Sequence, residues 1–333
     1  MKKSCFVLWG VLFSLFCSCS TGEAASIAAN LFRDNSQAPV FLDCKAVSET
    51  EIEFKFSRPV KVNSLQFSPS QEIALIEEGS TVRATLDKSP GQGVRLVADL
   101  LAEDERGNTT NVLVPFRSRN SRVPQLIINE LRTEYSKPRA EFIEFIAKSD
   151  GNLAALRVFA ASNNKNPMIY EFLPVEVKRG EYIVLHLRTL DEAANRNEYG
   201  TRLDESGGTD SSPTARDIWI PGSVKLLRKT DAVYVLDQDD HVLDAVMISE
   251  TPDQKWQKDY LAEAAEFLFS KGAWESPDGD ICIPANAVDS SSIKTAATKS
   301  ISREEKPDTN TQADWYITAT GGATPGMPNN PKR

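Results

Sequence analysis

Two histidines and two groups of acidic residues are the side chains best suited to catalysis or metal binding in this sequence. His186 lies in an apolar strand pattern, on the same face as Tyr182 and Val184, and His241 follows an acidic turn. A general base needs a partner that orients it, and a lone strand histidine usually packs or faces solvent. The sequence also contains no Gly-x-Ser-x-Gly elbow, HExxH pair, Cys-x-x-Cys pair or phosphate loop. We therefore expect no enzymatic activity, no catalytic residue and no cofactor.

The acidic residues form two groups, one in a tight turn and one in a polar loop. They are Asp237, Asp239 and Asp240 beside His241, and Asp204, Glu205 and Asp210. Calcium takes about six to eight oxygens on a shaped loop that usually bends at a glycine. The turn has no such glycine, so we expect a solvated hairpin tip. The loop carries Gly207-Gly208 and is more open to a metal, but the sequence assigns no metal ligand.

The N-terminal cysteines indicate lipid attachment. Two lysines and an apolar run from Cys5 to Cys17 are typical of a secretory signal peptide, and the run is too short for a membrane span. It ends in Leu15-Phe16-Cys17-Ser18-Cys19, which resembles a bacterial lipobox, where a small residue precedes the acylated cysteine. We expect cleavage after residue 18 and acylation (palmitate) of Cys19. Cys17 is the alternative acceptor, and Ala24-Ala25 is a competing site for ordinary signal peptidase.

Lipid attachment would place the protein in the cell envelope, anchored at the outer membrane on its periplasmic or surface face. Residues 1–18 would be the signal peptide and residues 19–37 the tether. Only Cys44 and Cys282 remain after such processing. They could pair in an oxidising envelope, but they lie in different expected domains, and two separate buried thiols are the favoured interpretation.

Length and composition indicate two folded domains without a nucleic-acid surface. A chain of 333 residues with 41% apolar content is long enough for two cores. The net charge of −9 and the pI near 5.0 argue against phosphate binding, which needs a concentrated basic patch.

Seven short strands are expected in the first domain, over residues 38–120. They are Val40–Cys44, Glu51–Phe56, Ser64–Phe67, Ile73–Glu77, Thr81–Leu86, Val94–Leu101 and Val112–Phe116. In the second of these, Ile52, Phe54 and Phe56 alternate with charged residues and should face a core. Arg58-Pro59 is interpreted as a turn. The segments IEFKFSRPV and DLLAEDERGN resemble bacterial Ig-like modules, which implies an immunoglobulin-like sandwich that serves as a spacer or adhesive module.

A polar linker, Arg117–Pro124, leads to a second domain expected over residues 125–330. Leu126–Arg132 and Glu141–Ala147 are its opening strands, and the second has apolar residues on both faces, as a central strand would. Further strands are expected at Met168–Leu173 and Glu181–Arg188. A hairpin joins Ala232–Asp237 to His241–Ile248.

Six separated motifs of this second domain resemble the lamin tail domain. They are IINEL, AEFIEF, NLAALRVF, RGEYIVL, DAVYVLDQDDHVLDAV and the closing group SISR, ADWYI and ATPGMPN. The resemblance implies an Ig-like β-sandwich in which Trp315 packs, with Ile317 on the same face. Ala155-Leu156 stands where the family has Gly-Trp, so one packing element has changed. The expected fold class is therefore all-β, with two Ig-like sandwiches in tandem.

Two insertions distinguish the second domain. Asp253–Ala273 reads as an amphipathic helix that starts near Pro252 and stops at Gly272. Its apolar stripe is Trp256, Tyr260, Leu261, Ala264, Phe267 and Leu268, and we expect it to pack on the sandwich rather than dock a partner. Asp191–Arg216 is a polar loop of the length that often carries function, and we expect it to contact a partner and to be dispensable for folding.

These features favour a non-catalytic, lipid-anchored envelope protein that acts in binding, adhesion or assembly, with an envelope or extracellular protein or glycan as partner. Two alternatives remain open. Lamin-tail modules in bacteria are often joined to nucleases or other hydrolases, so the chain could be an accessory subunit or a degenerate relative of one. It could also bind polysaccharide or peptidoglycan through Trp219, Trp256 or Trp274, although burial is the commoner use of each.

Overall fold

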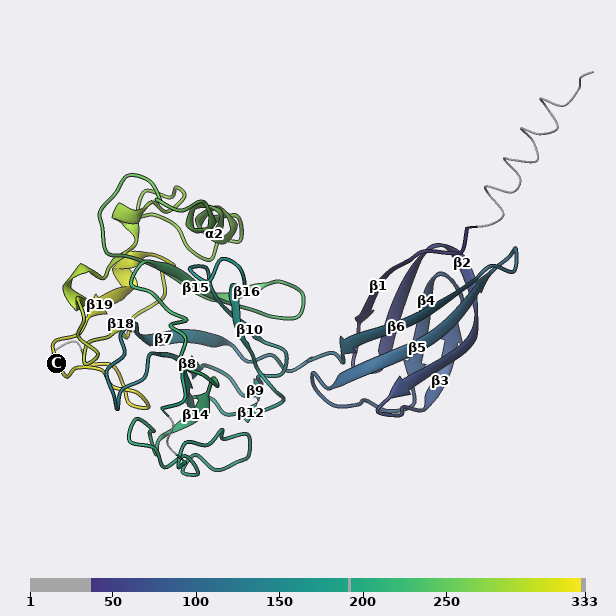
Figure 1. The fold of residues 1–333 in the computed structure, drawn as a ribbon, viewed down its shortest axis with the longest axis horizontal. Helices are drawn as coiled ribbons and strands as arrows, with labels where there is room; N and C mark the ends of the chain where they lie inside the picture. Colours follow the sequence, from purple (N-terminus) through teal and green to yellow (C-terminus); the bar gives the residue numbers. More distant parts are fainter. Residues whose placement is uncertain (1–36, 191–192, 331–333) are drawn as a thin grey trace, which may run out of the picture.

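The computed structural model describes residues 37–190 and 193–330. The expected signal peptide, the acceptor cysteines Cys19 and Cys17, and nearly all of the tether lie outside these residues. Figure 1 shows two β-rich bodies joined by a short connection, an N-terminal body (β1–β6) and a C-terminal body (β7–β19). Among the described residues, no helix combines the length and the apolar character that a membrane span requires.

The N-terminal body is built from six strands around one apolar core. They are β1 (Phe41–Ala46), β2 (Glu51–Ser68), β3 (Ile73–Glu77), β4 (Gly79–Leu86), β5 (Arg95–Asp104) and β6 (Thr109–Arg117). They pair in the order β3-β4-β2-β5-β6, and β1 also pairs with β2. Ile52, Phe54 and Phe56 are buried in the core, as their alternation predicts.

The turn expected at Arg58-Pro59 is wrong, because β2 is one continuous strand of 18 residues. Its first part pairs with β1 and β4, and its second part, from Val60, pairs with β5. Pro59 lies where the main pairing partner of β2 changes from β4 to β5. Proline has no backbone N–H, and at this point of β2 no ladder hydrogen bond is lost. The two expected strands on either side of it are therefore halves of one bent strand.

The C-terminal body places two main sheets around a second core. The strands are β7 (Leu126–Arg132), β8 (Phe142–Ala147), β9 (Gly151–Asn152), β10 (Arg157–Ala160), β11 (Met168–Glu171), β12 (Glu176–Val177), β13 (Tyr182–His186), β14 (Ala215–Trp219), β15 (Asp231–Leu236), β16 (Val242–Ser249), β17 (Val288–Asp289), β18 (Ile301–Arg303) and β19 (Trp315–Ile317). One sheet has the order β14-β13-β8-β7-β18-β19 and the other β11-β10-β15-β16-β17. β9 and β12 form a separate pair. The expected all-β class is thus confirmed, and β8 is a central strand.

The expected helical insertion is present but shorter than predicted. Helix α2 spans Asp259–Ser270, and it begins six residues after Asp253. Its buried residues are Leu261, Ala264, Ala265 and Leu268, and Trp256, Tyr260 and Phe267 pack partly buried against the same core. Figure 1 shows α2 above β15 and β16. The packing interpretation of the stripe is confirmed.

Burial also decides three smaller expectations. Trp315 is 6% exposed and belongs to the C-terminal core, so its structural role is confirmed, with Ile317 packed against the same core. Cys44 is half-buried and Cys282 is buried, and both thiols are free. The two cysteines therefore do not pair.

The backbone conformation at Ala155 explains why a glycine would suit this position of the NLAALRVF motif. Its φ is 59°, in the left-handed region that a Cβ disfavours. Its N–H donates to the Phe172 carbonyl at 2.9 Å, which fixes the backbone there.

We expect Ala155→Gly to stabilise the protein by about 1 kcal/mol, because the strain of the left-handed conformation exceeds the extra entropy of an unfolded glycine. Thermal unfolding of the two proteins measures this. Ala154→Gly is the control and should destabilise, since Ala154 has no positive φ and is fully buried. A lower melting temperature for Ala155→Gly would contradict the assignment of strain.

Candidate functional site

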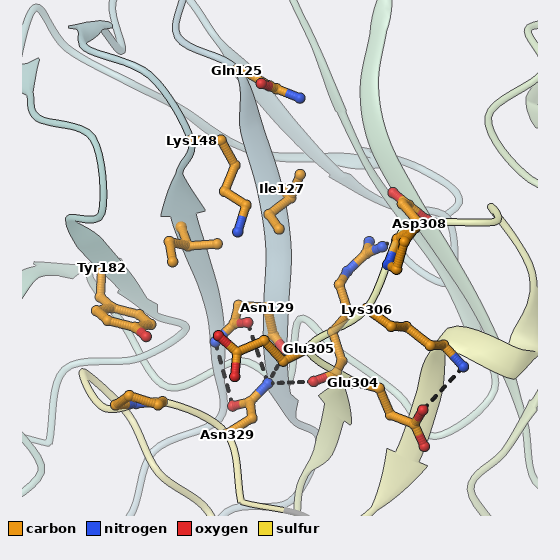
Figure 2. A pocket seen from close by; sticks show the side chains of 14 residues that line it. Gln125, Ile127, Asn129, Lys148, Tyr182, Glu304, Glu305, Lys306, Asp308 and Asn329 are labelled. Atoms are coloured by element: carbon orange, nitrogen blue, oxygen red, sulfur yellow. Dashed lines mark hydrogen bonds and ion pairs between the residues drawn. The ribbon is translucent and has the colours of Figure 1, made fainter.

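A pocket of about 310 Å³ opens on the face of the β7–β8–β13 sheet that points away from the C-terminal core. Its floor is a row of side chains, one from each strand. Ile146 of β8 pairs in register with Ile127 of β7 and with Tyr182 of β13. Because paired residues of neighbouring strands share a face, all three line the pocket, and Figure 2 shows Ile127 and Tyr182 there. This row of the floor is therefore apolar except for the Tyr182 hydroxyl.

A β-bulge at Asn129 shapes the next part of the floor. The β7–β8 register shifts between Ile128 and Glu130, so Asn129 is an extra residue without a partner on β8. Its side-chain amide donates to Glu144 Oε1 at 2.7 Å. The bulge also turns the Ile128 N–H toward the other sheet, where Asp244 Oδ2 accepts it at 2.6 Å. One bulge thus links the pocket to both sheets.

Arg303 holds the wall of the pocket. Its guanidinium pairs with Asp244 at 2.6 Å and with Asp308 at 2.9 Å, and its Nε donates to the Ile128 carbonyl at 2.8 Å. Its face lies 4.6 Å from the centre of the Trp315 ring. This arginine ends β18 and starts the segment 304–308, which forms one side of the pocket. Its position therefore sets the position of that segment.

The closing motif ATPGMPN forms a strap over the sheet, residues 324–329. The Thr324 N–H donates to Glu130 at 3.1 Å, and the Gly326 N–H donates to Glu144 at 2.5 Å. Asn329 donates to the carbonyls of Asn129 and Arg303. A Cβ on Gly326 would lie 2.1 Å from Ser212 Oγ, so only glycine fits. The motifs IINEL, SISR and ATPGMPN therefore meet here, although up to 200 residues separate their members.

Two opposite charges at the pocket mouth have no ion-pair partner among the described residues. Lys148 and Glu305 are both exposed, and Figure 2 shows the Lys148 ammonium and the Glu305 carboxylate reaching into the pocket. Burial, then the nearby carboxylates of Glu144 and Glu305, raises the pKa of Tyr182, so its hydroxyl remains a hydrogen-bond donor. The pocket can therefore offer a cation, an anion and a hydroxyl above an apolar floor.

A buried polar layer continues along the same face of the sheet. His186 Nε2 lies 2.7 Å from Asp217 Oδ1, and the His186 ring stacks on Trp219 with centroids 3.7 Å apart. Arg132 pairs with Asp210 at 2.8 Å. His186 and Asp217 are fully buried, and neither lines the pocket. The packing role expected for His186 fits this geometry.

Part of the polar loop belongs to this layer, which argues against the expectation that the loop is dispensable for folding, while its contact with a partner stays a prediction. Glu198 is fully buried and accepts from the backbone N–H of Ser206 and Asp217. Ser212 donates its N–H to Asp217 Oδ2 at 2.9 Å. Of the acidic residues predicted there, Asp210 is paired with Arg132, whereas Asp204 is exposed and paired with Arg202. The sequence could not reveal this, because polar loop residues normally face water.

The acidic hairpin tip is exposed at Asp239, Asp240 and His241, as expected, and it also contacts the linker. Asp237, Asp239 and His241 bring their ligand atoms within 4.8 Å of one another. However, Asp239 pairs with Arg119 at 2.5 Å, and Asp237 accepts from His241 Nδ1 at 3.0 Å. Gln238 accepts from the Asn120 N–H at 2.7 Å and donates to the Ser118 carbonyl at 2.9 Å. The hairpin tip therefore binds the linker between the two bodies through an ion pair and two hydrogen bonds.

The three tryptophans considered for glycan binding are used in packing. Trp219 and Trp274 are buried, with 3% and 1% exposed. Trp256 is half-buried and donates its indole N–H to the Cys282 carbonyl at 2.8 Å. None of them lines the pocket.

Two buried carboxylates lie side by side beneath the strap. Glu130 and Glu144 are directly paired across β7 and β8, and both are fully buried. Burial raises the pKa of Glu130, although Ser300, Thr324 and Ser302 donate to it. Burial, and then the charge of Glu130, raises the pKa of Glu144 well above its ordinary value. Because Glu130 and Glu144 are direct neighbours across the two strands, a charge on one disfavours ionisation of the other.

We expect Glu130→Gln to raise the melting temperature by several degrees at about pH 8 and to change it little at about pH 5. The pKa of Glu130 in the folded state is raised above its unfolded value of 4.5. The stability that the protonated Glu130 contributes is therefore fully present below pH 4.5 and is lost as the pH rises through the folded-state pKa. Glutamine removes the charge but keeps an oxygen for the serine donors. Glu305→Gln, at an exposed position, is the control and should leave the pH profile of unfolding unchanged. Equal shifts at both pH values would contradict the assignment.

Comparison with known proteins places the C-terminal body in a family. A family model described as "TP_1001_2nd: protein second domain" matches residues 124–317. An uncharacterized protein of Treponema pallidum (strain Nichols) is 27% identical over 202 residues, which are 57% of this chain and 50% of that protein, so the match spans about half the relative's length. A solved structure of a DUF4876 family protein from Bacteroides thetaiotaomicron VPI-5482 aligns over 86% of this chain and 93% of its own, with 11% identity and a TM-score of 0.27. Because the matched family segment is more than half of this chain, the chain belongs to the family of the TP_1001 protein second domain.

Proposed function

We propose that this chain is a lipid-anchored protein of the cell envelope that binds a partner without chemically altering it, and that it does so through the pocket beside the strap. In this proposal the C-terminal body is a lamin-tail-like module and the N-terminal body an Ig-like spacer. The motifs IINEL, SISR and ATPGMPN meet at the pocket, which supports the assignment of the C-terminal body as a lamin-tail-like module.

Lys148 and Glu305 carry the binding proposal. Both are exposed at the mouth of the pocket, above an apolar floor, and neither has an ion-pair partner among the described residues. Charged side chains that already have partners gain little from a ligand, but these two have none described. A ligand with an acidic group for Lys148 and an amino or amide donor for Glu305 would satisfy both. A short peptide or glycopeptide segment has this chemistry, and its apolar side chain would cover Ile127 and Ile146.

The absence of turnover is proposed on the chemistry of the groups that line the pocket. Tyr182 stays protonated, because its pKa is raised. Lys148 is exposed rather than desolvated, so nothing activates it as a nucleophile. The buried His186–Asp217 pair lies outside the pocket. The lining residues therefore favour recognition over reaction.

We expect soluble peptide-bearing peptidoglycan fragments to bind the protein and to shift the NMR signals of Ile127, Ile146 and Tyr182. Lys148→Glu should weaken this binding roughly tenfold or more, since it replaces an attraction by a repulsion. Lys255→Glu reverses the charge of an exposed lysine in the helical insertion and should have no effect on this binding. Binding that both variants retain equally, or release of a cleaved product, would reject the proposed site or the proposed lack of turnover.

We expect the native protein to partition into detergent and Cys19→Ala to move into the aqueous phase. Several acyl chains on one cysteine bury enough methylene groups, at about 0.8 kcal/mol each, for stable anchoring. Metabolic labelling with palmitate tests the same point, with Cys17→Ala as the control that should retain the label. An unlabelled wild-type protein would rule out the anchor.

A further inference from the structure

A second, larger groove of about 610 Å³ lies elsewhere on the C-terminal body and shares no lining residue with the pocket. Its walls are the β10–β11 loop with strand β11 and the segment that follows β14, residues 220–228. β11 and β14 are the end strands of the two main sheets. The groove therefore lies along the open side of the sandwich.

One wall of the groove is an edge strand. β11, Met168–Glu171, pairs with β10 and has no strand on its other side in the described structure. All four of its residues are half-buried, and Met168 and Ile169 line the groove. An accessible edge offers unpaired backbone N–H and C=O groups, to which an extended peptide can add as a further strand.

The groove is apolar inside. Met168, Ile169, Ile220 and Leu226 line it half-buried, and Leu187 closes its base. Val224 stands at the rim with 71% of its surface exposed, among the largest exposures of an apolar side chain in the described chain. Alternate side chains of an added strand would point onto these residues.

The rim of the groove is positively charged. Lys165 and Arg228 are both exposed, neither has an ion-pair partner in the described structure, and no aspartate or glutamate lines the groove. This is unusual in a chain with a net charge of −9. The rim therefore favours a partner that carries carboxylates.

The two walls are held in place before any partner arrives. The buried Asp231 carboxylate accepts the Ser162 N–H at 2.9 Å from one wall and the Arg228 N–H at 3.1 Å from the other. The Asn163 side chain also donates to the Leu226 carbonyl across the groove. A preformed groove reduces the entropy that binding must overcome.

We propose that this groove binds an extended acidic peptide segment of a partner protein, which adds to the edge of β11 and places alternate apolar side chains over Val224, Ile169 and Leu226. The carboxylates of the segment lie against Lys165 and Arg228. This surface is separate from the pocket, and its use does not depend on the function proposed for the pocket.

Selection from a displayed library of random octapeptides on the purified protein, residues 20–333, tests the proposal. The enriched peptides should alternate apolar and polar residues and be rich in aspartate and glutamate. Their synthetic versions should lose binding roughly tenfold or more on Arg228→Glu or Lys165→Glu, and on Val224→Glu. Methylation of alternate peptide nitrogens should abolish binding in one register and spare it in the other, because an added strand uses every second N–H.

Three matched controls make the result decisive. Leu75→Glu places the same change at another exposed apolar position, 53% exposed in the N-terminal body, and should leave peptide binding intact. Lys148→Glu should also leave it intact, which separates this groove from the pocket. Circular dichroism should show Val224→Glu to be folded, as the exposure of Val224 predicts. Failure to enrich any peptide, enrichment of basic peptides, or binding that survives Val224→Glu in a folded protein would each overturn the proposal.

Discussion

The ion pair between Arg303 and Asp244 is the interaction on which the C-terminal body depends. Arg303 ends a strand of one sheet and Asp244 lies on β16 of the other, and both side chains are nearly fully buried. A charge in such a place is stable only when it is paired and hydrogen-bonded, and Arg303 is satisfied on Asp244, Asp308 and the Ile128 carbonyl. Asp244 in turn accepts the N–H that the bulge in β7 releases. The bulge, the two sheets and the pocket wall are thus fixed by one contact.

Buried carboxylates organise the rest of this body in the same way. Glu130 and Glu144 hold the strap, Glu198 and Asp217 hold the polar loop, and Asp231 holds both walls of the groove. In each case a carboxylate accepts backbone N–H groups from irregular segments that have no ladder to join. This explains how long stretches without strands can cover the sheets of a small domain. It also explains why both candidate binding surfaces lie where such segments meet a sheet.

Local patterns in the sequence predict the parts of this fold that depend on local physics. Strict alternation identifies the buried face of Glu51–Phe56, helical spacing identifies the packed stripe of the insertion, and the polar link at 238–240 identifies a hairpin. The resemblance of the closing motifs identifies Trp315 as a core residue. These signals extend over a few residues, so a single sequence is enough to detect them.

Features that depend on distant partners could not be predicted from this sequence. Strand β14 lies in a stretch that mixes charged and apolar residues, and Arg216 and Asp217 are buried there only because Glu181, Glu198 and His186 bind them. The contacts of the polar loop and of the hairpin tip are hidden from the sequence for the same reason. The charge pairs that bind them, Arg132–Asp210 and Arg119–Asp239, join residues tens of positions apart, and neither partner signals the other. The pocket itself combines side chains from five separate segments.

A double-mutant cycle on Arg303 and Asp244 tests the central claim most directly. The free energy of unfolding is measured at about pH 8, above the pKa of about 6 to which burial raises Asp244. Arg303→Met and Asp244→Leu should each cost about 3–5 kcal/mol, because each leaves an unpaired buried charge. The double variant should cost clearly less than their sum, by about 2 kcal/mol or more. Single costs that add to within about 0.5 kcal/mol would show that the pair does not hold the two sheets together.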